Sequence, residues 1–204
     1  MSRQAVVEKK EKAMAKHEAH ESCEEASCEM SELRVGKPAP DAKAQALMPD
    51  GSFKEVRLSS FRGKWMVLFF YPLDFTFVCP TEIRSFNAQY DEFRKLGAEV
   101  LTASTDSVFS HKAWVEHGLG KVKFPMIGDT SHEVTRAFGV LLEDKGIALR
   151  GTFIIDPQGI ARSAVINDLS VGRSVEETLR TLQAFQTGEL TPCEWKPGTK
   201  TLGK

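Results

Sequence analysis

The sequence lacks the features that mark membrane-spanning, nucleic-acid-binding and disulfide-rich secreted proteins. Its 27 basic and 28 acidic residues give a formal net charge of -1, so it offers no strong positive field to nucleic acid. No apolar run approaches the roughly 20 residues that a membrane helix needs. Four cysteines in 204 residues are too few and too unevenly spaced for a disulfide scaffold, which favours catalytic, redox or metal-binding roles. These absences predict one soluble globular domain with extensions, and neither nucleic acid nor membrane as a partner.

Residues 1–32 are rich in Glu, Lys, Ala and His, and they predict a charged helix or a disordered arm outside the domain. This arm has no apolar signal-peptide core and many glutamates, which favours a cytoplasmic protein. His17, His20, Cys23 and Cys28 are four side chains of the kind that bind zinc. Their spacing is not a usual zinc-finger pattern, so incidental side chains of a solvated tail are the favoured interpretation. A local redox pair of the two cysteines is a further alternative.

The chain is organised around a hydrophobic run that ends shortly before a cysteine. Met66 to Tyr71 are continuously apolar, which is typical of a strand buried on both faces. After Cys79, apolar residues recur at steps of three and four up to Gly97, which predicts one helix with a single buried stripe. The residues of this stripe are Ile83, Phe86, Tyr90, Phe93 and Leu96. Pro80 suits the first helical position because it has no N–H to satisfy, so Cys79 is expected to be the cap.

A thiol at the start of a helix is favoured in its anionic form. Unpaired backbone N–H groups and the positive end of the helix dipole stabilise negative charge there, and the thiolate is the reactive nucleophile. Thr76, three residues earlier, can place a hydroxyl beside the sulfur or beside a substrate oxygen, and Pro72 is expected to shield the sulfur from water. The alternative is an inert buried thiol, the more common state of a lone intracellular cysteine, and position alone does not separate the two.

The rest of the chain alternates between strand and helix signals. Residues 98–105 predict a second core strand, which closes a parallel β-α-β unit. Ser107 can cap a helix, and Ser174 opens another through a capping box with Glu177. Residues 152–156 predict a strand that a proline-glycine turn joins to a partner strand. This order of elements begins to indicate a thioredoxin-like α/β fold.

The pattern Pro72-x-x-x-Thr76-x-x-Cys79, within Phe-Val-Cys-Pro-Thr-Glu, is highly specific, and through it the chain resembles the typical two-cysteine peroxiredoxins. The resemblance extends from about Leu33 to Thr201. It includes Trp114, Arg150 in Arg-Gly-Thr-Phe-Ile-Ile-Asp, the stretches Asn167-Asp168-Leu169 and Val171-Gly172-Arg173-Ser174, and Cys193 before Trp195-Lys196-Pro197-Gly198. It implies a thioredoxin-like domain over residues 33–188, with a central mixed sheet flanked by helices, and a C-terminal arm over residues 189–204.

The resemblance also implies the chemistry. Cys79 is expected to reduce hydrogen peroxide or a small organic hydroperoxide, and Cys193 of the partner subunit to resolve the product to an intersubunit disulfide. Thioredoxin or a similar dithiol protein is the implied reductant, no cofactor is implied, and the homodimers commonly close into rings of five.

Further site residues follow from the same resemblance. Arg150 is expected to stabilise the thiolate and to donate hydrogen bonds to peroxide oxygens, although spacing alone also fits an ordinary surface arginine. Trp114 is implied as a wall of the pocket, whereas His111, one turn away, is expected to contribute packing only. The implied pocket residues are Phe70, Val78, Glu82 and Trp114.

Two rival functions and one departure accompany this hypothesis. A thioredoxin-like disulfide oxidoreductase normally has C-x-x-C, whereas Pro-Thr-Glu follows Cys79 here. A binding or chaperone protein predicts that activity survives Cys79→Ser. Peroxide-sensitive relatives carry Gly-Gly-Leu-Gly and a terminal helix with Tyr-Phe, whereas this sequence has His117-Gly118-Leu119-Gly120 and ends at Lys204. We therefore expect easier local opening of the active site and resistance to overoxidation.

Overall fold

The structure is a computed structural model that describes residues 33–204. The interpretations given to residues 1–32, including the possible zinc ligands His17, His20, Cys23 and Cys28, lie outside the described residues. Within the described range, no helix has the length and apolar character needed to cross a membrane.

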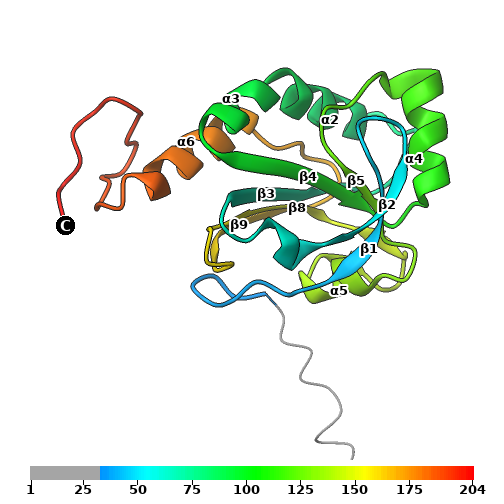
Figure 1. The fold of residues 1–204 in the computed structure, drawn as a ribbon, viewed down its shortest axis with the longest axis horizontal. Helices are drawn as coiled ribbons and strands as arrows, with labels where there is room; N and C mark the ends of the chain where they lie inside the picture. The colour runs from blue at the N-terminus through cyan, green and yellow to red at the C-terminus, as the bar shows by residue number, and fades with distance from the viewer. Residues whose placement is uncertain (1–32) are drawn as a thin grey trace, which may run out of the picture. The chain divides into compact units, whose positions relative to one another are not determined.

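A seven-stranded mixed sheet forms the centre of the domain (Figure 1). In spatial order its strands are β2 (Phe53–Arg57), β1 (Lys43–Leu47), β5 (Met126–Gly128), β4 (Ala98–Ser104), β3 (Trp65–Phe70), β8 (Arg150–Ile155) and β9 (Ala161–Asn167). The central strands β3, β4 and β5 run parallel, and the remaining pairs are antiparallel. A separate two-stranded sheet joins β6 (Leu141–Leu142) to β7 (Ile147–Ala148). The main sheet confirms the predicted α/β fold with a mixed sheet and a parallel β-α-β unit.

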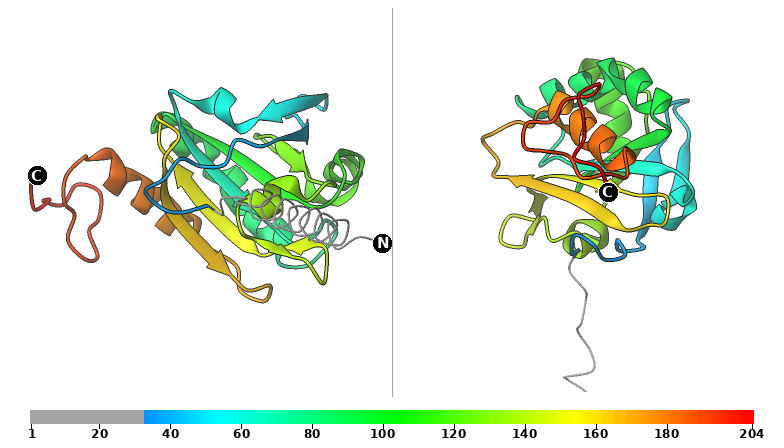
Figure 2. Two further views of the ribbon diagram at one scale, coloured as in Figure 1. Left: turned by 90° about the horizontal axis from the view of Figure 1, so that it is seen from below. Right: turned by 90° about the vertical axis from the view of Figure 1, so that its left-hand side faces the viewer.

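Helices cover both faces of this sheet (Figures 1 and 2). One face carries α2 (Cys79–Ala88), α3 (Tyr90–Lys95), α4 (Val108–Trp114) with its π-helical continuation η2 (Val115–Leu119), and α6 (Val175–Gln186). The other face carries α5 (Glu133–Ala137) and the short 3-10 helix η1 (Leu58–Phe61).

The apolar run in β3 is continuous because each face of the strand enters a different core. Val67, Phe69 and Tyr71 join the buried cluster on the side of α2, α3, α4 and α6. Met66, Leu68 and Phe70 join the cluster on the side of α5. Because side chains alternate along a strand, a central strand covered on both sides has no polar face. Cys79 belongs to the first cluster, so the site lies on the side of α2.

The helix after Cys79 differs from the prediction in two ways. The predicted single helix is two helices, because the backbone at Gln89 leaves the helical region with φ -97 and ψ 8 between α2 and α3. The cap is Val78, whose carbonyl accepts hydrogen bonds from the N–H groups of Thr81 and Glu82 at 3.0 and 3.3 Å. Cys79 is therefore the first residue of the helix and Pro80 the second, where a missing N–H still costs nothing.

The two predicted serine caps and the predicted turn agree with the structure, whereas the strand predicted at residues 152–156 is β8, Arg150–Ile155. The Ser107 and Ser174 hydroxyls accept hydrogen bonds from the N–H groups of Ser110 and Glu177, each at 3.2 Å, and so cap α4 and α6. The turn between β8 and β9 closes with a 2.9 Å bond from the Gly159 N–H to the Asp156 carbonyl.

The C-terminal arm continues from α6 and projects away from the sheet (Figure 1, red). Leu190 and Gly203 form a bridge at its base, so the segment between them is a closed loop. Trp195 is only 5% exposed, and its carbonyl accepts a 3.1 Å hydrogen bond from Arg180 Nη1 of α6. The arm is thus held to α6.

Candidate active site around Cys79

Cys79 lies at the junction of a buried strand, a short loop and a helix. β3 ends at Phe70, a loop follows, and α2 begins at Cys79. The side chain is fully buried, and its Sγ is 3.5 Å from Nη1 of Arg150. Arg150 is the first residue of β8, the antiparallel neighbour of β3, so adjacent strands place the guanidinium beside the sulfur.

A buried ion-pair network surrounds the sulfur. Glu82, one turn into α2, accepts hydrogen bonds from Arg150 Nη1 at 2.6 Å and from Arg173 Nε at 2.8 Å. These three side chains are 2 to 4% exposed. Arg150 also donates from Nε to the Leu169 carbonyl at 2.8 Å. Removal of charged groups from water costs free energy, and their pairing offsets this cost. The loss of one partner therefore destabilises the arrangement of the others.

Arg173 is the member that the sequence prediction did not assign to the site. Burial lowers the pKa of its guanidinium, and the hydrogen bond and charge of Glu82 oppose that shift. Its Nη1 donates to the Gly151 carbonyl at 2.6 Å and to Thr152 Oγ1 at 3.2 Å, which ties it to β8. An arginine just before a helix N-terminus opposes the helix dipole, which indicates that its charge is compensated elsewhere but does not identify the partner.

The loop before Cys79 holds the remaining predicted residues. Thr76 Oγ1 donates to the Leu73 carbonyl at 3.0 Å, and a hydroxyl that donates one bond still accepts others. Pro72 is buried and Val78 is half-buried. Phe75 has a left-handed φ of 54°, a conformation that costs energy in a residue with a side chain and that recurs near functional sites.

Trp114 and Phe70, two predicted pocket residues, lie on opposite sides of the sheet. Trp114 of α4 is 3% exposed, shares the buried cluster of Cys79, and has its ring centre 5.9 Å from that of Phe75. Phe70 lies in the cluster on the α5 side, with its ring near those of Phe138 and Phe153. The structure therefore brings Trp114 to the site, but it does not bring Phe70 there, because Phe70 points to the other face of β3.

A second buried polar network anchors the other end of the loop. Asp74 accepts a 2.7 Å bond from the Tyr71 hydroxyl, lies 2.8 Å from Nδ1 of His111, and donates its own N–H to Asp106. The Nε2 atom of His111 lies 3.1 Å from the Ile127 carbonyl. Burial, followed by the charge of Asp74, raises the pKa values of Tyr71 and Asp106. His111 was predicted to contribute packing only, but it takes part in the hydrogen bonding that holds the loop.

Cys193 lies in a contrasting environment. It is exposed in the C-terminal arm, and both Cys79 and Cys193 are free thiols. The structure does not bring the two cysteines together within one chain.

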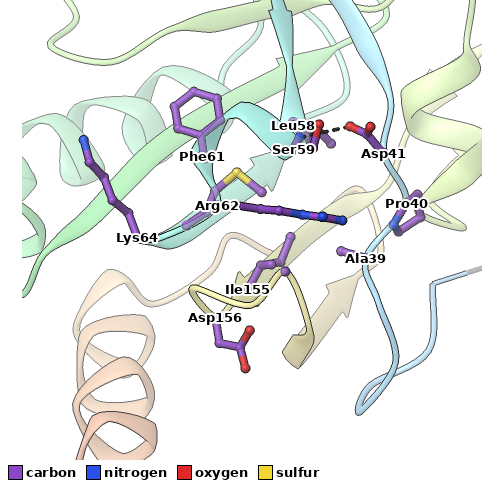
Figure 3. A pocket seen from close by; sticks show the side chains of 12 residues that line it. Ala39, Pro40, Asp41, Leu58, Ser59, Phe61, Arg62, Lys64, Ile155 and Asp156 are labelled. Atoms are coloured by element: carbon purple, nitrogen blue, oxygen red, sulfur yellow. Dashed lines mark hydrogen bonds between the residues drawn. The ribbon is translucent and has the colours of Figure 1, made fainter.

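A separate hollow lies between residues 39–41, η1 and the turn after β8 (Figure 3). Its walls include Arg62 and Lys64, and a 3.0 Å hydrogen bond joins the Ser59 N–H to Asp41. None of its residues belongs to the Cys79 network. Across residues 33–204, no group of three or more His, Cys, Asp or Glu side chains is arranged to hold a metal ion.

Comparison with known proteins identifies the family. The AhpC/TSA family profile matches residues 35–164. Peroxiredoxin-1 of Gallus gallus is 55% identical over 177 residues, which cover 82% of this chain and 89% of the relative. Peroxiredoxin prdx-2 of Caenorhabditis elegans is 54% identical over 182 residues, which cover 85% of this chain and 90% of the relative. The crystal structure of reduced Plasmodium vivax 2-Cys peroxiredoxin superposes with a TM-score of 0.79 at 39% identity, covering 81% of this chain and 91% of that one. The chain therefore belongs to the AhpC/TSA family, as a typical two-cysteine peroxiredoxin with thiol-dependent peroxidase activity.

Proposed function

We propose that the Cys79 thiolate is the nucleophile that attacks hydrogen peroxide or a small organic hydroperoxide. The 3.5 Å approach of Arg150 Nη1 to Cys79 Sγ is the observation that carries this proposal. The sulfur attacks one peroxide oxygen, the O–O bond breaks, and the leaving oxygen takes a proton and departs as water or an alcohol. Cys79 is left as a sulfenic acid.

Electrostatics support this assignment. Two guanidinium groups, Arg150 and Arg173, face the single carboxylate of Glu82 in a buried site. A Cys79 thiolate balances the remaining positive charge, whereas a neutral thiol leaves it uncompensated. Arg150 then has the position to stabilise negative charge that develops on the leaving oxygen.

The surrounding residues take supporting roles in this proposal. The Thr76 hydroxyl receives or donates a hydrogen bond at the peroxide, and Pro72 limits the access of water. Trp114 and Val78 form apolar walls, and Glu82 positions the two arginines. Phe70 acts from the far side of β3, by holding the strand in the core.

We propose that Cys193 of a partner subunit resolves the sulfenic acid. The Cys79 sulfenic acid and the Cys193 thiol condense to an intersubunit disulfide with the release of water. β9 is the end strand of the sheet, and its Val165 and Ile166 are 49% and 46% exposed. An exposed strand edge with apolar side chains favours pairing with another chain, which supports a homodimer built across β9.

Exposed aromatic side chains support further assembly of dimers into a ring of five. They are Phe53, Phe75, Phe77 and Phe109, which are 37, 59, 94 and 70% exposed. Phe53 and Phe109 contact each other edge to face, with ring centres 5.2 Å apart. Large apolar groups at the surface are typical of protein contacts.

In this proposal, thioredoxin or a similar dithiol protein reduces the disulfide by thiol exchange, and the cycle serves antioxidant defence and redox homeostasis in the cytoplasm. The principal rival is a binding or holdase function that does not need the thiol.

The test measures peroxide consumption with thioredoxin, thioredoxin reductase and NADPH, alongside non-reducing gels of the oxidised protein. Cys79→Ser is expected to be inactive, and both Cys79→Ser and Cys193→Ser are expected to lose the dimer-sized disulfide band. A Cys23→Ser, Cys28→Ser double variant is the matched control and is expected to keep full turnover. If Cys193→Ser keeps turnover and the band, while the double variant loses them, the resolving thiol lies in residues 1–32. Activity in Cys79→Ser contradicts the whole proposal.

A further inference from the structure

Helix α2 is held on the side opposite Glu82 by a second set of contacts. Arg84 donates from Nη2 to the Gly118 carbonyl at 2.8 Å and from Nε to the Leu119 carbonyl at 3.3 Å. Glu82 and Arg84 are two residues apart, which is about 200° around a helix, so they leave α2 on nearly opposite sides. The ion-pair network contacts one side of the helix, and the hydrogen bonds of Arg84 hold the other side.

The carbonyls that Arg84 contacts belong to the end of η2. The last carbonyls of a helix have no partner within the helix, so an outside donor satisfies them. The chain leaves η2 through Gly120, which has a left-handed φ of 87° and whose N–H bonds to the Val115 carbonyl at 3.2 Å. The guanidinium of Arg84 therefore caps the C-terminal end of η2 and links it to α2 by hydrogen bonds.

Asn87 strengthens the same attachment. It lies three residues after Arg84, on the same side of the helix. Its Nδ2 donates to the Lys121 carbonyl at 3.1 Å, and its Oδ1 accepts from the Lys123 N–H at 2.7 Å. We call these contacts of Arg84 and Asn87 with residues 118–123 the α2 latch.

Residues 118–123 are themselves fixed to the core. Leu119 and Val122 are each 6% exposed, Phe124 is 1% exposed, and all three belong to the buried cluster of Cys79. The latch therefore ties α2 to a segment that does not move without opening the core.

We propose that Arg84 is a positioning residue that sets how readily the first turns of α2 open. This inference rests on the proposed function, because Cys79 is fully buried and Cys193 reaches it only when these turns open. Two reactions compete for the sulfenic acid. Condensation with the Cys193 thiol forms the disulfide and releases water, whereas a second hydroperoxide transfers an oxygen, forms sulfinic acid and leaves as water or an alcohol. A tight latch favours the second reaction, and a loose latch favours the first.

The latch qualifies the expectation drawn from the sequence. The departure at residues 117–120 predicts easier opening, but two carbonyls of that segment bind Arg84. Arg84 thus limits the resistance to overoxidation that the departure predicts.

The experiment compares wild type, Arg84→Met, Arg84→Lys and Arg94→Met. Methionine keeps an unbranched apolar stem and the helix propensity of arginine but removes the donors. Arg94→Met is the matched control, because it removes the same charge from α3, where Arg94 pairs with Glu99 rather than with residues 118–123. Hydrogen exchange of the reduced protein is measured for peptides that span residues 79–88 and residues 150–167.

Arg84→Met is expected to raise exchange in residues 79–88 by roughly fivefold to tenfold, which is the effect of losing about two hydrogen bonds, and to leave residues 150–167 unchanged. Arg84→Lys is expected to give an intermediate value. In mass spectra, the peroxide concentration that converts half of Cys79 to sulfinic acid is expected to rise severalfold in Arg84→Met.

Unchanged exchange in Arg84→Met, or an equal increase in Arg94→Met, overturns the latch. Increased exchange without a change in the sulfinic acid threshold overturns its link to the catalytic cycle. The exchange measurement needs no peroxidase activity, so an inactive wild type contradicts the proposed function while the latch is still tested.

Discussion

Cys79 and Cys193 belong to two regions that are held in different ways. Cys79 is fully buried at the start of α2, where strands, helices and a buried ion-pair network meet. Cys193 is exposed in an arm that is attached to α6 through Trp195 and Arg180. In the proposed function, the first region fixes the geometry that a reaction with a small molecule requires, and the second keeps a thiol within reach of a large partner.

The difference also explains why the two thiols need not meet in one chain. A thiol in a closed pocket selects small substrates, because only they enter without unfolding the site. A thiol on an exposed arm meets whatever surface lies opposite, including a second copy of the chain. In the proposed cycle, opening of α2 connects the two regions, so the contacts that hold α2 govern when the second thiol acts.

The largest expected effect is on the first chemical step. In single-turnover reactions of reduced protein with hydrogen peroxide, Cys79→Ser is expected to show no sulfenic acid at position 79, because serine has no sulfur to oxidise. Cys193→Ser is expected to form sulfenic acid at Cys79 within about twofold of the wild-type rate, because the arm does not contribute to the pocket. Stopped-flow fluorescence with a sulfenic acid probe measures both. A large loss of rate in Cys193→Ser contradicts the division of labour between the two regions.

A smaller effect is expected from the charge at the centre of the first region. Glu82→Gln leaves Arg150 and Arg173 buried without their carboxylate, and the loss of one partner from a buried pair costs about 3 to 5 kcal/mol of unfolding free energy. Urea unfolding of the reduced protein, followed by tryptophan fluorescence, measures the change. Glu82→Asp keeps the charge and is expected to lose less. An unchanged midpoint in Glu82→Gln shows that the network does not stabilise the fold.

Much of the fold follows from patterns in the sequence. The apolar run of β3 and the Ser107 and Ser174 caps are local features, and the structure agrees with each. The break at Gln89 escaped prediction because the apolar stripe continues through it. The two helices bury the same stripe, so periodicity alone does not reveal that the backbone between them bends.

The site was predictable where a motif marks it and not where distant residues assemble it. Cys79 and Arg150 lie together as the motif implied. Arg173 joins Glu82 across 91 residues of chain, and no local pattern reports such a pairing. Phe70 shows the converse, because the family resemblance implied a pocket residue whereas the alternation of β3 turns its side chain to the other face.

The smallest expected effect concerns the region of Cys193. Arg180 donates two 2.7 Å bonds to Glu177 while it holds the Trp195 carbonyl, and the hydrogen bond from Arg180 lowers the pKa of Glu177 although partial burial opposes the shift. Because both side chains are substantially exposed, Glu177→Gln is expected to cost only about 0.2 to 1 kcal/mol at pH 7.

The same substitution has a pH dependence whose sign is fixed. A carboxylate with a lowered pKa in the folded state stabilises the fold above its unfolded value of 4.5, and this contribution is lost as the pH falls through the lower folded value. The free energy of unfolding measured in urea is therefore expected to differ between wild type and Glu177→Gln at pH 7. This difference is expected to shrink below pH 4.5. Glu176→Gln, one residue earlier on the exposed surface of α6, is the matched control. A loss of unfolding free energy in Glu177→Gln as large as that in Glu82→Gln implies that the arm of Cys193 is held as firmly as the site of Cys79. That result removes the contrast between the two regions.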